Sequence, residues 1–261
     1  MLKYLIIFVS IITITSFSQD KWNPQNLKNQ FGKFLDTTIE VSINPTLPNY
    51  HFRYREYYEA GDISPNIGTT FFRLDIYRND IDTILQVIES SSDVYGGPTN
   101  YEYGYNDIGL KGMLIDYNFD GYKDIRFNYM SGVNAYAVNQ FYEVYLYNPL
   151  KNYFEFNNSF GDLCNPTPFP KEKVIRTYRR ELSFGRRGEV CTYSWKNNKL
   201  ILQREDYFEI RDENILDSLG WDESDFLYYK DYYKDNQVIK SDTSIIKGKS
   251  IPEKYKRYWN G

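Results

Sequence analysis

One short stretch of the sequence carries oxygen-bearing residues at every second position. It reads Asp-Tyr-Asn-Phe-Asp-Gly-Tyr-Lys-Asp from residue 116 to residue 124. A hard cation such as calcium takes roughly six to eight oxygen ligands, and calcium loops supply them at alternating positions. Gly121 stands at position 6, where such a loop needs a sharp turn that a Cβ would hinder. The sequence therefore predicts a calcium site whose ligands, at positions 1, 3, 5, 7 and 9, are Asp116, Asn118, Asp120, Tyr122 and Asp124.

The residues on either side of this loop indicate strands, not the helices of a helix–loop–helix calcium hand. Position 12 of the loop is Phe127, so the bidentate Glu of that motif is absent. Residues 112–115 form a short apolar run, and from Ile125 to Tyr129 apolar and polar residues alternate. We therefore expect the loop to join two strands. An ordinary Asp/Asn/Gly turn that binds no ion is the alternative interpretation.

The first 18 residues have the pattern of a secretory signal peptide. Lys3 precedes an apolar run over residues 4–14, and small and hydroxyl-bearing residues follow before Gln19. This pattern predicts cleavage after Ser18 and a periplasmic or secreted protein. No later stretch approaches the ~20 apolar residues of a membrane span, so we expect none in the mature form. An uncleaved N-terminal anchor helix is the alternative.

Composition limits the function classes further. The net charge is −4, which argues against nucleic acid as a partner because such partners call for a clustered basic face. The chain has 27 Tyr and 17 Phe, residue types that suit half-buried strands. Two cysteines, Cys164 and Cys191, could form a disulfide in an oxidising compartment or stay as two separately buried thiols.

Strand-like segments separated by turn residues favour a mainly β, antiparallel fold of meanders and hairpins, such as a β-sandwich or barrel. We expect a polar segment over residues 19–70, which precedes or packs on a β domain over residues 71–261. Within these ranges we expect a loop or an edge strand at residues 50–65 and an irregular connection at residues 130–139. Short helices are expected at residues 25–35, 215–219 and 252–259.

The run from Leu114 to Ile125 resembles a signature of a family of exported bacterial calcium-binding proteins. One member type is a periplasmic inhibitor of animal-type lysozyme with a tachylectin-like β-propeller fold. The similarity covers roughly residues 71–210 and is most specific in the calcium loop. The resemblance implies a propeller-like fold, the five calcium ligands named above, and a lysozyme-type cell-wall hydrolase as partner. Supporting features are residues 145–147 before Asn148-Pro149, residues 154–156, Leu163 before Asn165-Pro166, and the hairpin after Trp195.

Three function classes follow, and we favour the first, a calcium-stabilised binding or inhibitor protein that acts on an extracellular or envelope partner. The second is a carbohydrate-binding module that stacks Trp195, Trp221 or Trp259 on sugar rings. The third is a secreted hydrolase. His51 is the one histidine, so nucleophile–histidine catalysis has little support, and we expect no enzyme.

Overall fold

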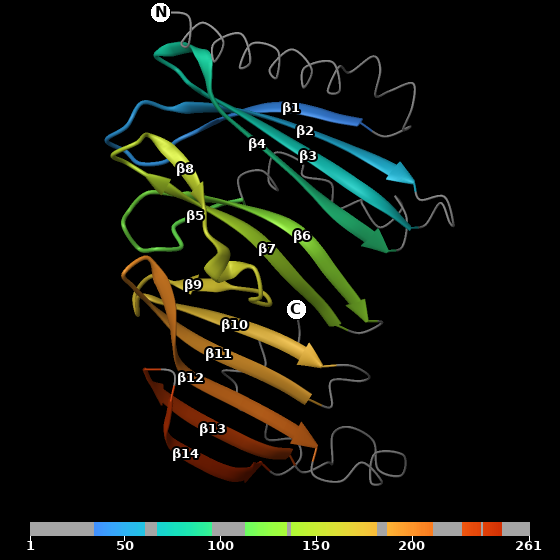
Figure 1. Cartoon of the computed structure of the whole chain (residues 1–261), viewed down its shortest axis with the longest axis vertical. Helices are drawn as coiled ribbons and strands as arrows, with labels where there is room; N and C mark the ends of the chain where they lie inside the picture. The colour runs from blue at the N-terminus through green and yellow to red at the C-terminus, as the bar shows by residue number, and fades with distance from the viewer. Residues whose placement is uncertain are drawn as a thin grey trace, which may run out of the picture. The chain divides into compact units, whose positions relative to one another are not determined.

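The computed structural model describes residues 34–60, 67–95, 113–134, 137–181, 187–210, 226–235 and 237–246, and most of them lie in antiparallel strands (Figure 1). The predicted mainly β fold of hairpins and meanders is confirmed. The helical structure within these ranges is one 3₁₀ turn, η2 (Asn158–Phe160), and none of them forms a helix that could cross a membrane. The predicted signal peptide and the predicted helices at residues 215–219 and 252–259 lie outside the described residues. Of the helix predicted at residues 25–35, the described part begins at Phe34 and is a strand.

The chain divides into two compact units, Met1–Gly112 and Met113–Gly261. The boundary predicted after residue 70 falls inside a strand of the first unit. The described part of that unit forms a four-stranded meander in which each strand pairs with its neighbour in sequence. Its strands are β1 (Phe34–Val41), β2 (Tyr50–Ala60), β3 (Ile67–Arg78) and β4 (Ile81–Tyr95).

The prediction of a loop or edge strand at residues 50–65 is wrong for residues 50–60, because β2 pairs with β1 on one side and β3 on the other. The rest of the predicted range lies outside the described residues. Phe52 and Tyr54 are buried on one face, and the charged residues Arg53 and Arg55 alternate with them on the other. Arg55 on that second face contacts Asp75, which also accepts a hydrogen bond from Arg73 (Nε–Oδ1 2.7 Å). A strand with arginines on one face can therefore lie inside a sheet, since carboxylates from the next strand neutralise them.

The first testable prediction concerns Glu56 on β2. Burial raises its pKa to about 7, although the hydrogen bond donated by the Tyr54 hydroxyl (2.7 Å) acts in the opposite direction. A carboxyl whose pKa is raised on folding destabilises the fold once pH exceeds its unfolded pKa, and the penalty is complete above the folded pKa. Glu56→Gln keeps an acceptor for Tyr54 and removes the charge. We expect it to be neutral near pH 4 and to stabilise by about 1–2 kcal/mol at pH 8. Urea unfolding at both pH values measures this, and an equal effect at both would contradict it.

The second unit contains two meanders. The first joins β5 (Leu114–Ile115), β6 (Asp124–Asn134), β7 (Ala137–Asn148) and β8 (Tyr153–Phe156). β6 pairs with both β5 and β7, and β7 pairs with β8. The irregular connection predicted at residues 130–139 is wrong, because β6 continues to Asn134 and β7 already begins at Ala137. Polar residues such as Ser131 and Asn139 hide this hairpin in the sequence pattern.

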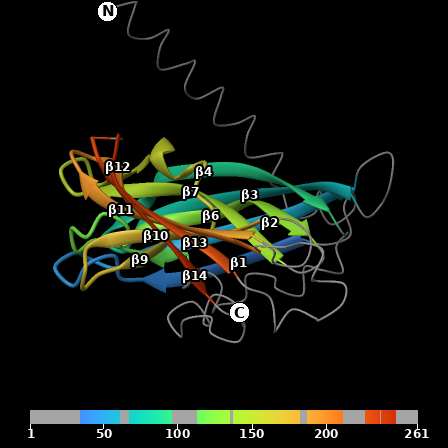
Figure 2. The same ribbon diagram turned by 90° about the horizontal axis from the view of Figure 1, so that it is seen from below.

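The second meander has six strands, each paired with its neighbour in sequence, and Figure 2 shows β10 to β14 fanned as expected for a twisted sheet. Asn197 and Asn198 connect β11 to β12 with positive φ angles of 52° and 59°, which confirms the predicted tight hairpin. The strands are β9 (Thr167–Phe169), β10 (Val174–Glu181), β11 (Arg187–Lys196), β12 (Lys199–Ile210), β13 (Phe226–Lys234) and β14 (Gln237–Ile246).

The resemblance implies a propeller-like fold. The described strands form no closed barrel, and a six-stranded meander exceeds the four strands of a propeller blade. The sandwich alternative of our prediction is therefore the better description of these open sheets.

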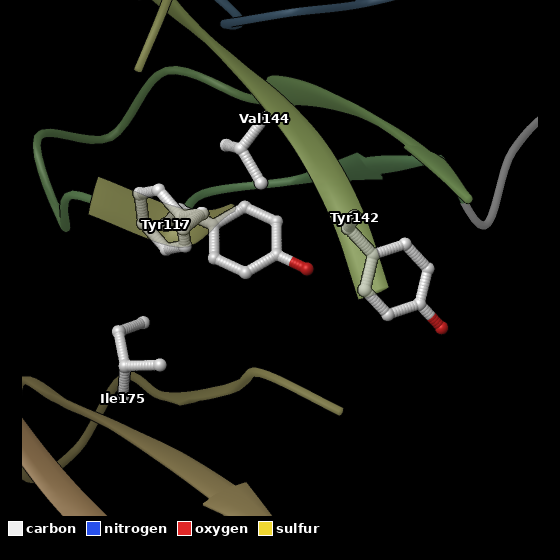
Figure 3. Packing of buried hydrophobic residues seen from close by; sticks show 5 residues of the cluster. Tyr117, Tyr142, Val144 and Ile175 are labelled. Atoms are coloured by element: carbon white, nitrogen blue, oxygen red, sulfur yellow. The ribbon is translucent and has the colours of Figure 1, made fainter. Parts of the chain in front are cut away.

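A small aromatic cluster forms the core of the second unit. Tyr117 comes from the loop after β5, Tyr142 and Val144 from β7, Phe160 from η2, and Ile175 from β10 (Figure 3). The edge of the Tyr117 ring meets Phe160, with ring centroids 5.1 Å apart. The predicted calcium loop thus has one residue anchored in this core. The two cysteines, Cys164 and Cys191, are both buried and are not bonded to each other.

Candidate metal centre

The loop of residues 116–123 is the connection between two paired strands. Leu114 and Ile115 on β5 face Ile125 and Asp124 on β6, so the chain must reverse direction within these eight residues. It does so with two residues in the left-handed region, Phe119 (φ 61°) and Gly121 (φ 89°). Gly121 adopts this conformation at no steric cost, whereas Phe119 is held there while its ring packs against the aromatic core. The predicted strand–loop–strand context is confirmed.

Three of the predicted ligands fold back onto the backbone of the loop. Asp116 Oδ2 accepts the Gly121 N–H (3.0 Å), Asn118 Oδ1 accepts the Asp120 N–H (3.2 Å), and Asp120 Oδ1 accepts the Tyr122 N–H (2.9 Å). In addition, the Asn118 amide nitrogen donates to Asp120 Oδ2 (2.9 Å). The structure therefore places Asp116, Asn118 and Asp120 in one turn, where each accepts a backbone N–H of the loop.

Asp116 has one oxygen that these contacts do not use. Oδ1 is buried, and within the described residues it has no hydrogen-bond partner. Burial raises the pKa of this carboxyl and the charge of Asp120 raises it further, while the backbone N–H groups of Gly121, Phe119 and Asp120 act in the opposite direction. A buried carboxylate oxygen without a donor is unfavourable unless a cation compensates it. This atom is the observation on which the fit of a cation to the loop depends.

Asp124 occupies a different position from the other three side chains. It is fully buried, and its two oxygens accept the N–H groups of Tyr117 (Oδ2, 2.7 Å) and Tyr147 (Oδ1, 2.9 Å). Burial raises its pKa to about 7 against the effect of these two donors, and the charges of Asp120 and Asp116 act in the same direction as burial. Asp124 thus connects the start of the loop to β7. Each oxygen keeps a second lone pair, and its role as a ligand stays a prediction.

The fifth predicted ligand, Tyr122, stands at position 7 of the loop, which in calcium loops supplies a main-chain carbonyl. Its ring packs against the ring of Tyr147, with centroids 5.4 Å apart, so the residue is fixed to the same strand that Asp124 contacts. Among the described residues, no three His, Cys, Asp or Glu side chains gather as a metal cluster. A cation here would therefore depend on Asp116 and Asp120 together with the Asn118 amide oxygen and the Tyr122 carbonyl.

Of the other residues named as candidates from the sequence, the structure describes His51 and Trp195. His51 lies on β2 in the first unit, opposite Glu40. The Trp195 ring stacks on Phe160, with centroids 6.0 Å apart, so one face of this ring already contacts the core. Trp221 and Trp259 lie outside the described residues. Sequence reasoning missed that Asp124 and Tyr147 join the loop to β7.

The fold and this loop define an antiparallel β protein with a short, oxygen-rich turn between two strands. No family model matches the chain, and no curated protein matches it. A solved structure described as that of a Xanthomonas Type IV secretion system related protein is similar, with 16% sequence identity and a TM-score of 0.45. The alignment covers 80% of this chain and 100% of that one.

Proposed function

We propose that this chain is an exported calcium-binding β protein that binds a protein partner outside the cytoplasm. The supporting observation is the Asp116 carboxylate, whose Oδ1 is buried without a donor among the described residues beside Asn118 and Asp120. Calcium would replace the missing donor at this oxygen and reduce the repulsion between Asp116 and Asp120. Asp116, Asn118, Asp120 and the Tyr122 carbonyl would hold the ion.

In this proposal the ion has a structural role. Asp124 and the Tyr117 ring already fix one end of the loop to the core and to β7. The outer part, around Asp120 and Gly121, is exposed and is held by hydrogen bonds within the loop. A cation that binds there would order an exposed turn on a fixed base. Metal binding of this kind stabilises a protein by mass action, because the unfolded chain cannot hold the site.

Calcium-dependent stability tests the metal part of the proposal. At a calcium concentration about a hundredfold above Kd, we expect a gain of about 2–3 kcal/mol, which raises Tm by about 5–10 °C. Asp116→Asn should abolish this gain in stability. The side-chain oxygen of the asparagine can still accept the Gly121 N–H, but its NH₂ group then points towards the cation and cannot bind it. Lys123→Ala is the matched control, since this side chain is exposed in the same loop and has no place in the ligand set.

Differential scanning fluorimetry with calcium and with EGTA measures both variants against the wild-type protein. Equal melting temperatures of the wild type in the two buffers would contradict the metal site. An equal calcium response in Asp116→Asn and Lys123→Ala would contradict the assignment of Asp116.

For the partner, we propose a lysozyme-type cell-wall hydrolase, which is the partner class that the resemblance of the calcium loop implies. Inhibition of a purified animal-type lysozyme, assayed with calcium on bacterial cell walls, tests this directly. The expected result is inhibition by the wild type and by Lys123→Ala, with a weaker effect for Asp116→Asn. No inhibition by any of the three proteins would reject this partner class and leave the calcium test unaffected.

A further inference from the structure

β14 is an end strand of the six-stranded sheet in the described part of the second unit. β14 pairs with β13 on one side, and no described strand pairs with its other side (Figure 1). Residues 237–244 are all exposed, and they include Val238 (49%) and Ile239 (63%). Such an edge offers a row of main-chain donors and acceptors to another strand. Natural proteins protect edges with charges or Pro, and β14 contains no Pro and two opposite charges.

The order of these charges makes β14 complementary to itself. Lys240 and Asp242 flank Ser241, and both point to the same face of the sheet, where they form an ion pair (Nζ–Oδ2 2.8 Å). When two copies of the strand pair antiparallel about Ser241, Lys240 of each copy stands opposite Asp242 of the other. Opposite charges at directly facing positions stabilise a strand pair, and like charges destabilise it.

Other registers lack this match. Centring the pair on Lys240 places two lysines opposite each other, and centring it on Asp242 places two aspartates opposite each other. Centring the pair between Ser241 and either of its neighbours places Lys240 and Asp242 opposite uncharged residues. The register centred on Ser241 also brings Ile239 opposite Thr243, a pair of β-branched residues that suits a sheet, and Val238 opposite Ser244.

The edge strand of the first unit gives a useful contrast. β1 also pairs with one described strand, β2, and its charged residues Asp36 and Glu40 flank Thr38. The corresponding pairing about Thr38 places Asp36 of each copy opposite Glu40 of the other. This register of β1 is repulsive, whereas the register of β14 about Ser241 is attractive.

We propose that β14 is a self-association surface, through which two copies of this chain pair antiparallel about Ser241 into a two-fold symmetric dimer. The same patch serves both copies, as an isologous interface requires. Pairing extends the sheet across the two-fold axis and satisfies the outer main-chain groups of both strands. This inference is independent of calcium and of the proposed partner.

Charge reversal at two positions tests the pairing. Lys240→Asp and Asp242→Lys each replace two attractive cross-strand pairs by two repulsive ones, and we expect the dimer dissociation constant to rise about tenfold or more. Mixing the two single variants restores complementarity, because the acids at 240 and 242 of one chain face the lysines at 242 and 240 of the other. In the mixture, the like charges at residues 240 and 242 still repel each other within each strand. Recovery of the dimer in the mixture therefore reports only the contacts between the two chains.

Sedimentation velocity of the full mature chain, from about 1 µM to about 200 µM protomer, measures association in each case. We expect the wild type to dimerise with rising concentration, each single variant to be shifted towards monomer, and the equimolar mixture to recover dimer. Lys151→Asp is the matched control, since Lys151 is similarly exposed and pairs with an acid on its own chain, Glu155. It should behave as the wild type does.

Three outcomes would overturn the proposal. They are a wild-type protein that stays monomeric over the whole range, single variants that dimerise as the wild type does, and a mixture that recovers no dimer. Circular dichroism of each variant verifies that the β fold is retained before association is compared.

Discussion

Asp75→Ala is expected to lower the free energy of unfolding by about 3–5 kcal/mol, the largest effect of any single substitution considered. Asp75 is 1% exposed and lies between two buried guanidinium groups, those of Arg55 and Arg73. Arg73 also contacts Glu89 (Nη1–Oε1 2.9 Å), which is itself half exposed. Removing Asp75 therefore takes away a carboxylate that both arginines contact in a buried environment. Breaking such a pair is costly because charge stays buried without its partner.

Asp36→Ala is the control for this prediction. Asp36 forms an ion pair with Arg53 (2.7 Å) on the same face of the same sheet, but both side chains reach solvent. An exposed pair of this kind contributes about 0–1 kcal/mol. Urea unfolding of both variants at pH 7 measures the difference. Equal losses for the two variants would show that the burial of Asp75 has no energetic consequence.

Asp124→Asn should destabilise the protein by about 2–4 kcal/mol in calcium-free buffer, the second largest effect. The two oxygens of Asp124 accept the N–H groups of Tyr117 and Tyr147, in full burial. Asparagine can accept from one of these groups, and its own NH₂ group must then point towards the other. The substitution therefore removes one buried hydrogen bond and places two donors face to face. The connection between the loop and β7 should weaken with it.

Asp120→Asn separates the positioning role of Asp124 from a role in metal binding. Asp120 is exposed, and an asparagine there keeps an acceptor for the Tyr122 N–H. In EGTA we expect this variant to lose less than about 1 kcal/mol. In calcium it should lose most of the metal-dependent gain, because a charged ligand is missing. If Asp124→Asn were as stable as Asp120→Asn in EGTA, the buried carboxylate would not hold the loop.

Local sequence patterns indicate some of the hairpins of this protein. The alternation from Phe72 to Tyr77 before the turn residues Asn79-Asp80 is typical of a hairpin, and β3 and β4 form one there. The hairpin predicted after Trp195 turns at Asn197 and Asn198, between β11 and β12. These features depend on residues close in sequence, where turn chemistry and the two-residue period determine the structure.

The position of β2 could not be predicted in the same way. Its charged residues suggested a loop, because the partner that allows Arg55 to be buried, Asp75, lies 20 residues further along the chain. A periodic pattern of polarity depends on single residues, so it cannot show that a residue on a neighbouring strand neutralises a charge. A similar limit hid the β6–β7 hairpin, where polar residues at 131 and 139 lie on paired strands.

The candidate site was predicted in its composition and only partly in its geometry. Spacing predicted that Asp116, Asn118 and Asp120 would converge on one turn, and the structure places them together. Spacing gave Asp124 the same role, since position 9 often carries a ligand. Its hydrogen bond to Tyr147 joins residues 23 positions apart, and no local pattern reports such a contact.

Calcium titration of the metal-free protein by isothermal calorimetry tests the central claim most directly. We predict saturable binding with a stoichiometry of about one ion per chain. Binding should be lost in Asp116→Asn and unchanged in Lys123→Ala. Absence of binding heat in the wild type, confirmed by equilibrium dialysis, would contradict a cation site in the loop between β5 and β6.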